Sequence, residues 1–505
     1  MAEMRPDLVI IGSGVGGAAV ARQLAPTGLR ILILERGERL AEEPQRSDPE
    51  AVFVEQRYRT REVWQDATGR RFRPGQYYQL GGHTKFYGAA MFRFRESDFA
   101  EVAHEEGVSP AWPVGYADLA PFYAEAERLF GVRGAVGSDP TEPPRGPFAH
   151  AAVPHEPTVA RLAEALARQG LHPGPMPVAV DFGPGGACVR CGTCDAFACR
   201  FDAKGDAETR LLRPLRASPN VEIWTGARVL RLIAAADGRI EAAEILRGGE
   251  RVRVAAPRFV LSAGAINSAL VLLRSADERH PEGLANRSGV VGRYLMNHHL
   301  TGLMALDPFR RNETRFPKTL TVNDFYHGLP GDPAARGNIQ MLGKIREPMI
   351  RSAQPRLPRA IGAWLAAHST DVLVMSEDPP VWENRVRPLG DESAEVTWKP
   401  ADFAAHDRFV RHVRGLLRRS GYPVVLRHGF GIESPSHQCG TVRMGSDPTR
   451  SALDPFCRAW DHRNLHVVDA GFFPSSAALN PALTVAAQAL RVGAHIAAAP
   501  LDAAA

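Results

Sequence analysis

The chain has 505 residues, too many for one hydrophobic core, so at least two domains are expected. Its hydrophobic content of 44% and charged content of 23% are typical of a globular protein, and its net charge of +5 is not concentrated in basic blocks. We therefore expect no nucleic-acid partner. No membrane anchor is visible and the first residues leave no room for a signal peptide, which predicts a cytoplasmic protein.

The start of the chain carries the pattern of a dinucleotide-binding unit. An apolar run at 8–11 leads into Gly12, Ser13, Gly14 and Gly17, and an alanine-rich amphipathic stretch follows. This order predicts a buried strand, a tight turn and a helix. Gly12 permits the turn, Gly14 lets the backbone approach a pyrophosphate at the helix N-terminus, and Gly17 lets the helix lie close to the strand.

A second buried strand is predicted at 30–34, and it ends at Glu35, which Arg36 follows. In dinucleotide sites an acidic residue about 20 positions beyond the glycines holds a ribose hydroxyl. The alternative is a glycine turn in another kind of strand–helix–strand unit. Strand, glycines, helix and acid occur together here, which favours the dinucleotide site.

A second glycine-rich loop follows a long polar stretch. Residues 38–78 are arginine-rich with weak periodicity, so we expect a surface excursion there. Gly81, Gly82 and Thr84 then lie beside small residues, which permits close backbone contact with a flat ligand. Beyond this loop an amphipathic helix is predicted to run to about Leu129.

Residues 130–187 are rich in proline and glycine, with one helix predicted from about Thr158 to Gln169. We expect this region to wrap the surface or to cover the active site. Farther along, residues 221–225 and 227–233 alternate as strands, and a buried strand at 259–264 enters a helix at 266–274.

Four of the six cysteines lie close together in the sequence, at Cys188, Cys191, Cys194 and Cys199. Their gaps superficially resemble an iron–sulfur run, and zinc is an alternative. The last gap is longer than in such runs and no proline follows it. We therefore predict reduced thiols or a disulfide staple, with no metal. Cys439 and Cys457 are predicted to be buried thiols.

Residues from about Thr301 to Phe430 predict a separate domain, with strands at 371–375 and 394–398. One helix is clear there, because an apolar stripe runs over 403–417 with arginines outside it and a glycine after it. Two histidines on this helix are predicted to lie on the surface, His406 and His412.

Taken together, these motifs resemble the glucose-methanol-choline (GMC) flavoprotein oxidoreductases. They occur in the same order as in that family, over almost the whole chain. The segments that carry the resemblance are Gly12 to Gly17 with Glu35, Leu80–Gly82, Trp112-Pro113, Tyr116–Leu119, Val260–Ser268, Val291–His298, Ser436–Thr441, Val467–Asp469 and Asn480-Pro481. The resemblance implies FAD as cofactor and oxidation of an alcohol by hydride transfer to flavin N5.

The resemblance also implies an α/β architecture in two parts. A Rossmann-like FAD-binding domain is expected to be discontinuous, over 1–100, 200–300 and 431–505. Connecting or lid segments are expected at 101–199. An α+β substrate domain built on an antiparallel sheet is expected at 301–430.

The same resemblance assigns contacts to the cofactor. Beyond the first turn, Glu35 and Arg36, the implied FAD contacts are Gly81, Gly82, Thr84, Val229 through its backbone, Ala263, Asp469, Ala470 and Pro481. Members with covalent flavin have a histidine where this chain has Phe86, so we expect FAD without a covalent link. His83 is predicted to be a loop residue that hydrogen-bonds backbone, with attachment to the flavin as the alternative. Relatives often have asparagine where Tyr87 stands, so the contact made there is open.

Removal of hydride from an alcohol carbon is difficult while the hydroxyl keeps its proton, so a base with a pKa near neutrality is needed. His437 matches the family's catalytic histidine and Asn480 its partner. Asn480 before Pro481 is also the pattern of a helix N-cap, and the positive end of that helix would stabilise reduced flavin. His298 and His299 are predicted to be structural, at a domain junction.

The partner Asn480, the cysteine loop and the residues after His437 are similar to those of pyranose and glycoside oxidases, including bacterial C-glycoside 3-oxidases. We therefore expect oxidation of a secondary hydroxyl of a sugar or glycoside, with oxygen or another electron acceptor. Three alternatives are a lyase of the same fold, a dehydrogenase of non-sugar alcohols and a nicotinamide-dependent dehydrogenase. The last would not need the second glycine loop or the Asn480 segment.

Overall fold

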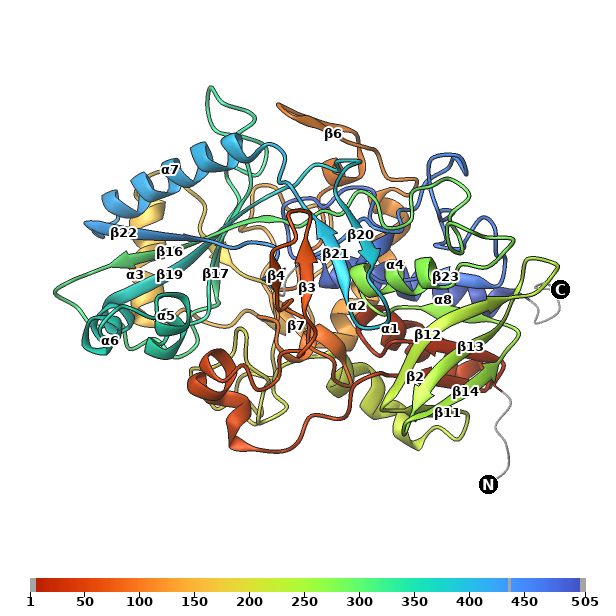
Figure 1. Cartoon of the computed structure of the whole chain (residues 1–505). Helices are drawn as coiled ribbons and strands as arrows, with labels where there is room; N and C mark the ends of the chain where they lie inside the picture. Colours follow the sequence, from red (N-terminus) through yellow and green to blue (C-terminus); the bar gives the residue numbers. More distant parts are fainter. Residues whose placement is uncertain (1–5, 435–436, 500–505) are drawn as a thin grey trace.

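A five-stranded parallel sheet forms the centre of one half of the protein, on the right in Figure 1. The computed structural model describes residues 6–434 and 437–499. The strand order is β11-β2-β1-β15-β23, and every neighbouring pair runs parallel. The bounds in that order are Val221–Trp224, Ile31–Leu34, Leu8–Ile11, Phe259–Leu261 and Leu465–Val467. The sheet takes strands from the start, middle and end of the chain, so the predicted discontinuous Rossmann-like domain is confirmed.

The first unit of this sheet forms as its residue types require. All four residues of β1 are buried and apolar, which suits a parallel strand covered on both faces. Helix α1 (Val15–Leu24) follows and buries a face of glycines and alanines, including Gly16 and Gly17. Small side chains allow this helix to lie against β1, and β2 then pairs with β1 from Leu8 onward.

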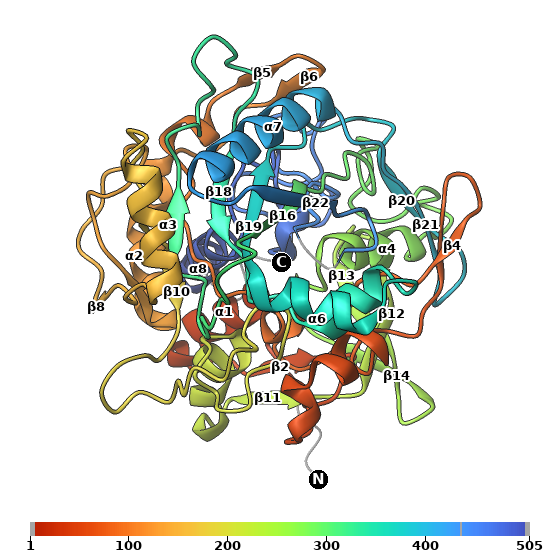
Figure 2. The ribbon, with the colours of Figure 1, turned by 90° about the vertical axis from the view of Figure 1, so that its left-hand side faces the viewer.

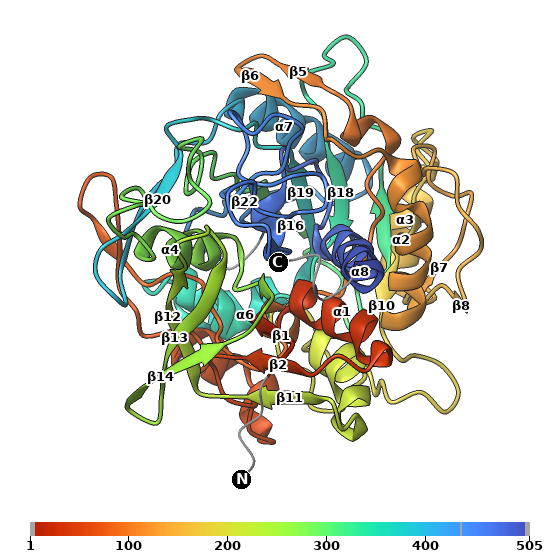
Figure 3. The ribbon, with the colours of Figure 1, turned by 90° about the vertical axis from the view of Figure 1, so that its right-hand side faces the viewer.

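Two further helices cover the same side of the sheet as α1. Helix α8 (Ala482–Ala498) packs beside α1 and α2 (Tyr116–Phe130), as Figure 3 shows. A Cβ added at Gly493 would lie 2.8 Å from Cβ of Gln23, so α8 and α1 meet closely. No helix of the described residues is long and apolar enough to cross a membrane.

Helix α4 (Ala265–Arg274) packs against β12, the first strand of an antiparallel meander. The strands of the meander, β12, β13 and β14, span Ala227–Ala234, Ile240–Arg247 and Glu250–Ala255.

The other half is built on a six-stranded sheet, on the left in Figure 1. Its order is β22-β16-β19-β18-β17-β9 and every neighbouring pair is antiparallel, as predicted. The bounds in that order are Val424–Gly429, His299–Leu306, Ser369–Ser376, Asn338–Met341, Leu320–Val322 and Gly174–Pro175. Figure 2 shows helix α7 (Phe403–Arg419) along this sheet, and α3 (Pro157–Ala167) packs into the same apolar core. A pair of short helices, α5 (Glu347–Ala353) and α6 (Arg359–His368), lies nearby.

Two segments lie in a different part of the structure from the one expected. Helix α3 and strand β9, expected in the connecting region 101–199, join the core and the sheet of the substrate half. Strands β20 (Arg385–Pro388) and β21 (Ala394–Thr397), expected in the substrate domain, leave its sheet and pair with β3 (Trp64–Asp66) and β4 (Arg71–Phe72).

The same four-stranded sheet shows that the prediction of a surface excursion at 38–78 is wrong for part of this stretch. Trp64 and Phe72 are buried in the main core together with Val386 and Val396. These apolar residues are covered only because two distant segments pair, which local periodicity does not show.

Helix α7 agrees closely with the predicted span, but its buried face is shifted. His406 is 2% exposed and bonds the hydroxyls of Thr301 and Ser376, each at 2.9 Å. Phe403, assigned to the apolar stripe, is instead 49% exposed. The prediction that His406 lies on the surface is therefore wrong, because the helix turns that face toward β16 and β19.

Candidate active site

The glycine turn at the end of β1 is packed on two sides by backbone. A Cβ added at Gly12 would lie 2.2 Å from the carbonyl oxygen of Ser262, and one at Gly16 would lie 1.9 Å from that of Val468. A Cβ at Gly17 would lie 2.1 Å from the oxygen of Gly12. These contacts exclude any side chain, so the turn lies directly against the residues that follow β15 and β23. Gly16 has the tightest contact of the three and was not singled out from the sequence.

Gly14 is different, because no described atom lies within 4 Å of a Cβ added there. The same is true of Gly264, which follows β15 with a φ of +90°. Gly82 faces this space too, since its added Cβ would lie 3.1 Å from Cα of Gly14. Gly14 and Gly82 thus border one open region beyond the end of β1, and Gly264 leaves room beyond the end of β15, where such folds bind nucleotides.

Glu35 ends β2 as an acceptor beside this region. Its carboxylate accepts hydrogen bonds from the backbone N–H of Gly37 at 2.8 Å and of Ser13 at 3.1 Å. Burial raises the pKa of Glu35, and these bonds oppose the rise. Its own carbonyl accepts the N–H of Ala227 at 2.9 Å, which brings β12 and Val229 to the end of β2.

Arg36 packs at the outer side of the same strand end. Its guanidinium pairs with Glu62 at 2.7 Å and lies 3.6 Å from the ring centre of Tyr78. In the described structure Arg36 is therefore held by protein groups at the edge of the nucleotide region.

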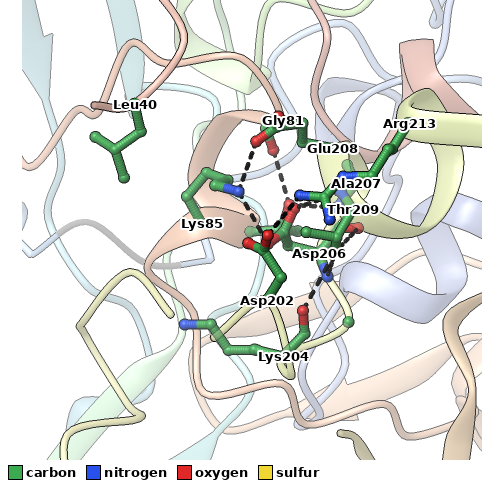
Figure 4. A network of polar contacts seen from close by, with 12 residues as sticks. Leu40, Gly81, Lys85, Asp202, Lys204, Asp206, Ala207, Glu208, Thr209 and Arg213 are labelled. Carbon is green, nitrogen blue, oxygen red and sulfur yellow. Dashed lines mark hydrogen bonds and ion pairs between the residues drawn. The ribbon is translucent and has the colours of Figure 1, made fainter. Parts of the chain in front are cut away.

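A buried ion cluster, drawn in Figure 4, holds the second glycine loop in place. Nζ of Lys85 lies 2.7 Å from Glu208 and 3.1 Å from Asp206, and all three side chains are buried. The hydroxyl of Thr84 donates to the carbonyl of Gly81 at 2.7 Å and accepts the N–H of Ala207 at 3.0 Å. Thr84 therefore shapes the loop, while Lys85 attaches it to the segment after the cysteines.

Phe86, at the position of the covalent histidine in some relatives, belongs to an aromatic cluster. It stacks on Tyr77 with ring centres 4.3 Å apart and contacts Tyr58 at 5.6 Å. Nε2 of His83 lies 3.0 Å from Oε1 of Gln76 and 3.4 Å from the backbone nitrogen of Tyr77. Both side chains are thus engaged in the loop's own packing, and the hydroxyl of Tyr87 donates to the carbonyl of Gly205.

Asp469 joins the ends of β15 and β23. It accepts the N–H of Gly471 at 2.8 Å and of Gly264 at 3.1 Å, and the hydroxyl of Ser268 also donates to it. Burial raises the pKa of Asp469 to about 6. Ala263 and Ala470 flank these groups, so the predicted residues around Asp469 come together at one edge of the sheet.

These features fit an FAD. Glycines 14, 82 and 264 leave room for a ligand to approach backbone, and Glu35 offers carboxylate oxygens at the end of β2. When bound, FAD supplies the acceptor for the hydride of the alcohol.

The segment from His437 to Thr441 is held between the two halves, while Ser436 of the same motif lies outside the described residues. His437 has a φ of 67°, a left-handed conformation that is uncommon outside glycine. Cys439 and Met296 exchange two backbone hydrogen bonds of 3.0 Å, and the N–H of Gly440 donates to Ala470 at 3.1 Å. Such a conformation costs about 1–3 kcal/mol and persists where the surroundings over-determine it.

This antiparallel bridge sets His298 opposite His437, because each lies two residues from the bonded pair, on the same face. Their Nδ1 atoms are 2.8 Å apart, and Nε2 of His298 lies 2.9 Å from the carbonyl oxygen of Ser476. The prediction that His298 is only structural is therefore incomplete, since its ring contacts the candidate base. His299 points elsewhere, and its Nε2 bonds the carbonyl of Ala401 at 2.6 Å.

Asn480 meets the other nitrogen of the same ring. Its Nδ2 lies 3.4 Å from Nε2 of His437, and its Oδ1 accepts from Gln340 at 2.9 Å. Helix α8 begins one residue later than expected, with Pro481 at the N-cap position and no side-chain capping bond. The proposed capping role of Asn480 is therefore wrong, because its amide is used in this cluster.

The surroundings favour the neutral form of the histidine pair. Burial, followed by His298 and the ammonium of Lys318, lowers the pKa of His437 well below its ordinary value. Burial likewise lowers the pKa of His298. His437 is thus available as a proton acceptor at neutral pH.

The six cysteines are free thiols, and no described group of three or more His, Cys, Asp or Glu side chains is arranged to hold a metal ion. Burial raises the pKa of Cys194 to about 12, so this thiol stays protonated. Cys439 and Cys457 are buried, as predicted. That the loop from Cys188 to Cys199 holds no iron cluster stays a prediction.

The parallel sheet with its glycine turn and terminal acid defines a dinucleotide-binding oxidoreductase fold. More narrowly, the chain belongs to the GMC oxidoreductase family, since residues 8–300 and 388–489 match the models of its N- and C-terminal parts. The resemblance seen in the sequence is confirmed. The protein is an oxidoreductase that acts on CH–OH donors, and its cofactor is FAD.

Two curated relatives are similar over nearly the full chain. The 6'''-hydroxyparomomycin C oxidase of Streptomyces lividus is 33% identical over 97% of this chain and 91% of its own length. Paromamine 6'-oxidase of Streptomyces fradiae is 34% identical over 96% and 90%. Among solved structures, pyridoxine 4-oxidase from Mesorbium loti shares the fold with a TM-score of 0.67 at 20% identity, over 97% of this chain and 99% of that one.

Proposed function

We propose that the protein oxidises a hydroxyl group of a glycoside or amino sugar, with His437 as general base and Asn480 as its hydrogen-bonding partner. The observation that carries the proposal is the approach of Nδ2 of Asn480 to Nε2 of His437, at 3.4 Å. A long contact of this kind in a protein without substrate is typical of catalytic groups that tighten around the reacting atom.

The two side chains have separate tasks in this reaction. Nε2 of His437 takes the hydroxyl proton as the carbon loses its hydride. The amide N–H of Asn480 donates to the substrate oxygen and so supports the negative charge that develops there. The N-terminus of α8 lies next to Asn480, and its partial positive charge favours negative charge on neighbouring groups.

The substrate class is supported by the comparison with relatives. The relatives at 33% and 34% identity are named as oxidases of 6'''-hydroxyparomomycin C and paromamine. A secondary hydroxyl, as in glycoside 3-oxidases, stays a prediction.

The test is anaerobic rapid mixing of the FAD-bound protein with aminoglycosides, neutral glycosides and simple aliphatic alcohols. We expect flavin bleaching to be fastest with a glycoside, and the product analysis to show which hydroxyl was oxidised. Bleaching by aliphatic alcohols alone would contradict the substrate class. Bleaching by no alcohol would favour the lyase alternative. Oxygen admitted after bleaching then separates an oxidase from a dehydrogenase.

A further inference from the structure

Two chains of hydrogen bonds meet at Nε2 of His437, and each begins at a group that can only accept. The first begins at the carbonyl of Ser476. Because this oxygen has no proton, Nε2 of His298 at 2.9 Å must carry one. A neutral imidazole has a single N–H, so Nδ1 of His298 is an acceptor, and Nδ1 of His437 at 2.8 Å must donate to it. Nε2 of His437 is then left with a lone pair.

The second chain begins at the carboxylate of Asp139, which is paired with Arg95. A carboxylate accepts, so Nδ2 of Asn323, 2.6 Å away, is the donor. This fixes the direction of the Asn323 amide, and its Oδ1 accepts from Nδ2 of Asn338 at 2.7 Å.

The direction continues through two more amides. Oδ1 of Asn338 accepts from Nε2 of Gln340 at 2.7 Å, and the same Nε2 donates to Oδ1 of Asn480 at 2.9 Å. Asn480 therefore turns its Nδ2 toward His437. Asn323, Asn338 and Gln340 are at most 1% exposed, so water offers them few competing partners.

The two chains agree where they meet, since an amide N–H from one faces a ring nitrogen with a lone pair from the other. We infer that they fix the resting tautomer of His437, with its proton on Nδ1, and that His298 and Gln340 are the positioning residues on either side. This inference rests on the proposed role of His437 as base. The other tautomer would present N–H to the substrate hydroxyl and would accept no proton there.

His298 also has a part after proton transfer. When Nε2 of His437 takes the hydroxyl proton, its Nδ1–H remains bonded to the lone pair of His298. An acceptor in this place stabilises the imidazolium, as the carboxylate does for the histidine of a Ser-His-Asp triad. The second chain needs no change during this step, because the alcohol oxygen replaces the ring nitrogen as the acceptor of the Asn480 N–H.

The direct test reads the tautomer in the resting FAD-bound protein. Nitrogen chemical shifts of histidine-labelled protein, assigned by difference against His437→Gln, separate protonated from unprotonated ring nitrogens. We expect Nδ1 protonated and Nε2 unprotonated at neutral pH. A proton on Nε2 would overturn the inference. If His437→Ala instead kept the parental rate of flavin reduction, the proposed function would fail while the tautomer measurement stood.

A kinetic test uses His298→Leu, which removes the acceptor, and His298→Asn, whose amide oxygen can replace Nδ1. At saturating alcohol, His298→Leu should slow flavin reduction by roughly 10-fold for one lost hydrogen bond, and by up to roughly 10⁴-fold if the wrong tautomer dominates. The alcohol dissociation constant should change less than about twofold, and His298→Asn should recover part of the rate.

The matched control is His299→Leu. His299 is as buried as His298 and also bonds a backbone carbonyl, but it does not contact His437. Equal losses in His299→Leu and His298→Leu would show a structural effect and contradict the inference.

Gln340→Met tests the second chain, since it removes both donated hydrogen bonds at similar volume. It should slow flavin reduction several-fold in protein that retains FAD. Gln488→Met is its control, because Gln488 is equally buried and donates to the carbonyl of Pro455 at 3.0 Å. If both variants reduce their flavin at the parental rate, Gln340 does not orient Asn480.

Discussion

The nucleotide turn at 12–17 and the site around His437 are built in different ways. In the turn, glycines contact other backbone directly, and the added methyl groups would lie 1.9–2.2 Å from carbonyl oxygens. In the catalytic site, side chains make the contacts, and His298, Gln340, His437 and Asn480 come from four separate segments. The turn forms because side chains are absent from it, whereas the catalytic site depends on hydrogen bonds with a defined direction.

This difference predicts different failures. A substitution in the turn should act through sterics, on folding or on cofactor affinity. A substitution in the catalytic site should leave both nearly unchanged and act on the rate of flavin reduction. The following experiments test that separation.

The largest effect is expected from His437→Ala. General-base assistance is typically worth about 10²–10⁴-fold, so anaerobic flavin reduction should slow by that factor. FAD should remain bound, because the side chain is not part of the turn. Rapid mixing gives the rate and the flavin spectrum gives occupancy. A parental rate would place the base elsewhere.

Within the turn, Gly16→Ala and Gly14→Ala should have opposite effects on the apoprotein. Gly16→Ala forces a methyl group against the carbonyl of Val468, and overpacking typically costs about 1–3 kcal/mol. The methyl group of Gly14→Ala meets no described atom within 4 Å, and the backbone there is ordinary extended chain. The free energy of unfolding should therefore be unchanged or higher by up to about 1 kcal/mol.

The same pair of variants should differ in cofactor binding. Gly14→Ala places its methyl group where the pyrophosphate is expected, so FAD affinity should fall although the apoprotein is stable. Denaturant unfolding of apoprotein and fluorescence titration with FAD measure the two quantities. Full FAD affinity in Gly14→Ala would contradict the assignment of this region.

Asn480→Ala should slow flavin reduction less than His437→Ala does. A net hydrogen bond is worth about 0.5–1.5 kcal/mol, or roughly 2- to 12-fold. The double variant should lose less than the product of the two factors, because both side chains act on one hydroxyl. No cap is removed, so the melting temperature should change little. Multiplicative losses would indicate independent roles.

The pH dependence should reflect the lowered pKa of His437. The base works unprotonated, so the rate of reduction at limiting alcohol should stay level down to about pH 6.5, the ordinary histidine pKa, and fall only below it. The profile of His437→Ala, recorded in the same buffers, should lack this acidic limb. A parental limb centred above pH 7 would contradict the lowered pKa.

The last prediction concerns how the cofactor is attached, and here no covalent bond is expected. Phe86 occupies the linking position and is packed against Tyr77, so FAD should be held without a covalent bond. Acid precipitation should leave the yellow colour in the supernatant. Colour retained in the pellet would point to a covalent link at another residue.

The comparison also explains what the sequence could predict. The turn, Glu35 and the helices predicted at 266–274 and over 403–417 follow from local patterns and are found in the structure, whereas the antiparallel domain was implied by the resemblance to the family. His437 and Asn480 were located by resemblance to the family, and they do come together.

His298 and Gln340 were missed for physical reasons. The contact of His298 with His437 depends on the bridge between Met296 and Cys439, which no local periodicity reveals. Gln340 did carry a signal, because Asn338 and Gln340 are polar at alternate positions of a fully buried strand. Such buried polar pairs need partners, and here the partners form the amide chain.

The packing of α8 against α1 joins two helices that are more than 400 residues apart in the sequence. During synthesis the glycine turn precedes strand β23 and helix α8, which enclose it. The turn therefore lacks the carbonyl of Val468 and the N-terminus of α8 until those later segments have been made. A chain truncated before β23 would have the nucleotide motif but only four of the five parallel strands that frame it.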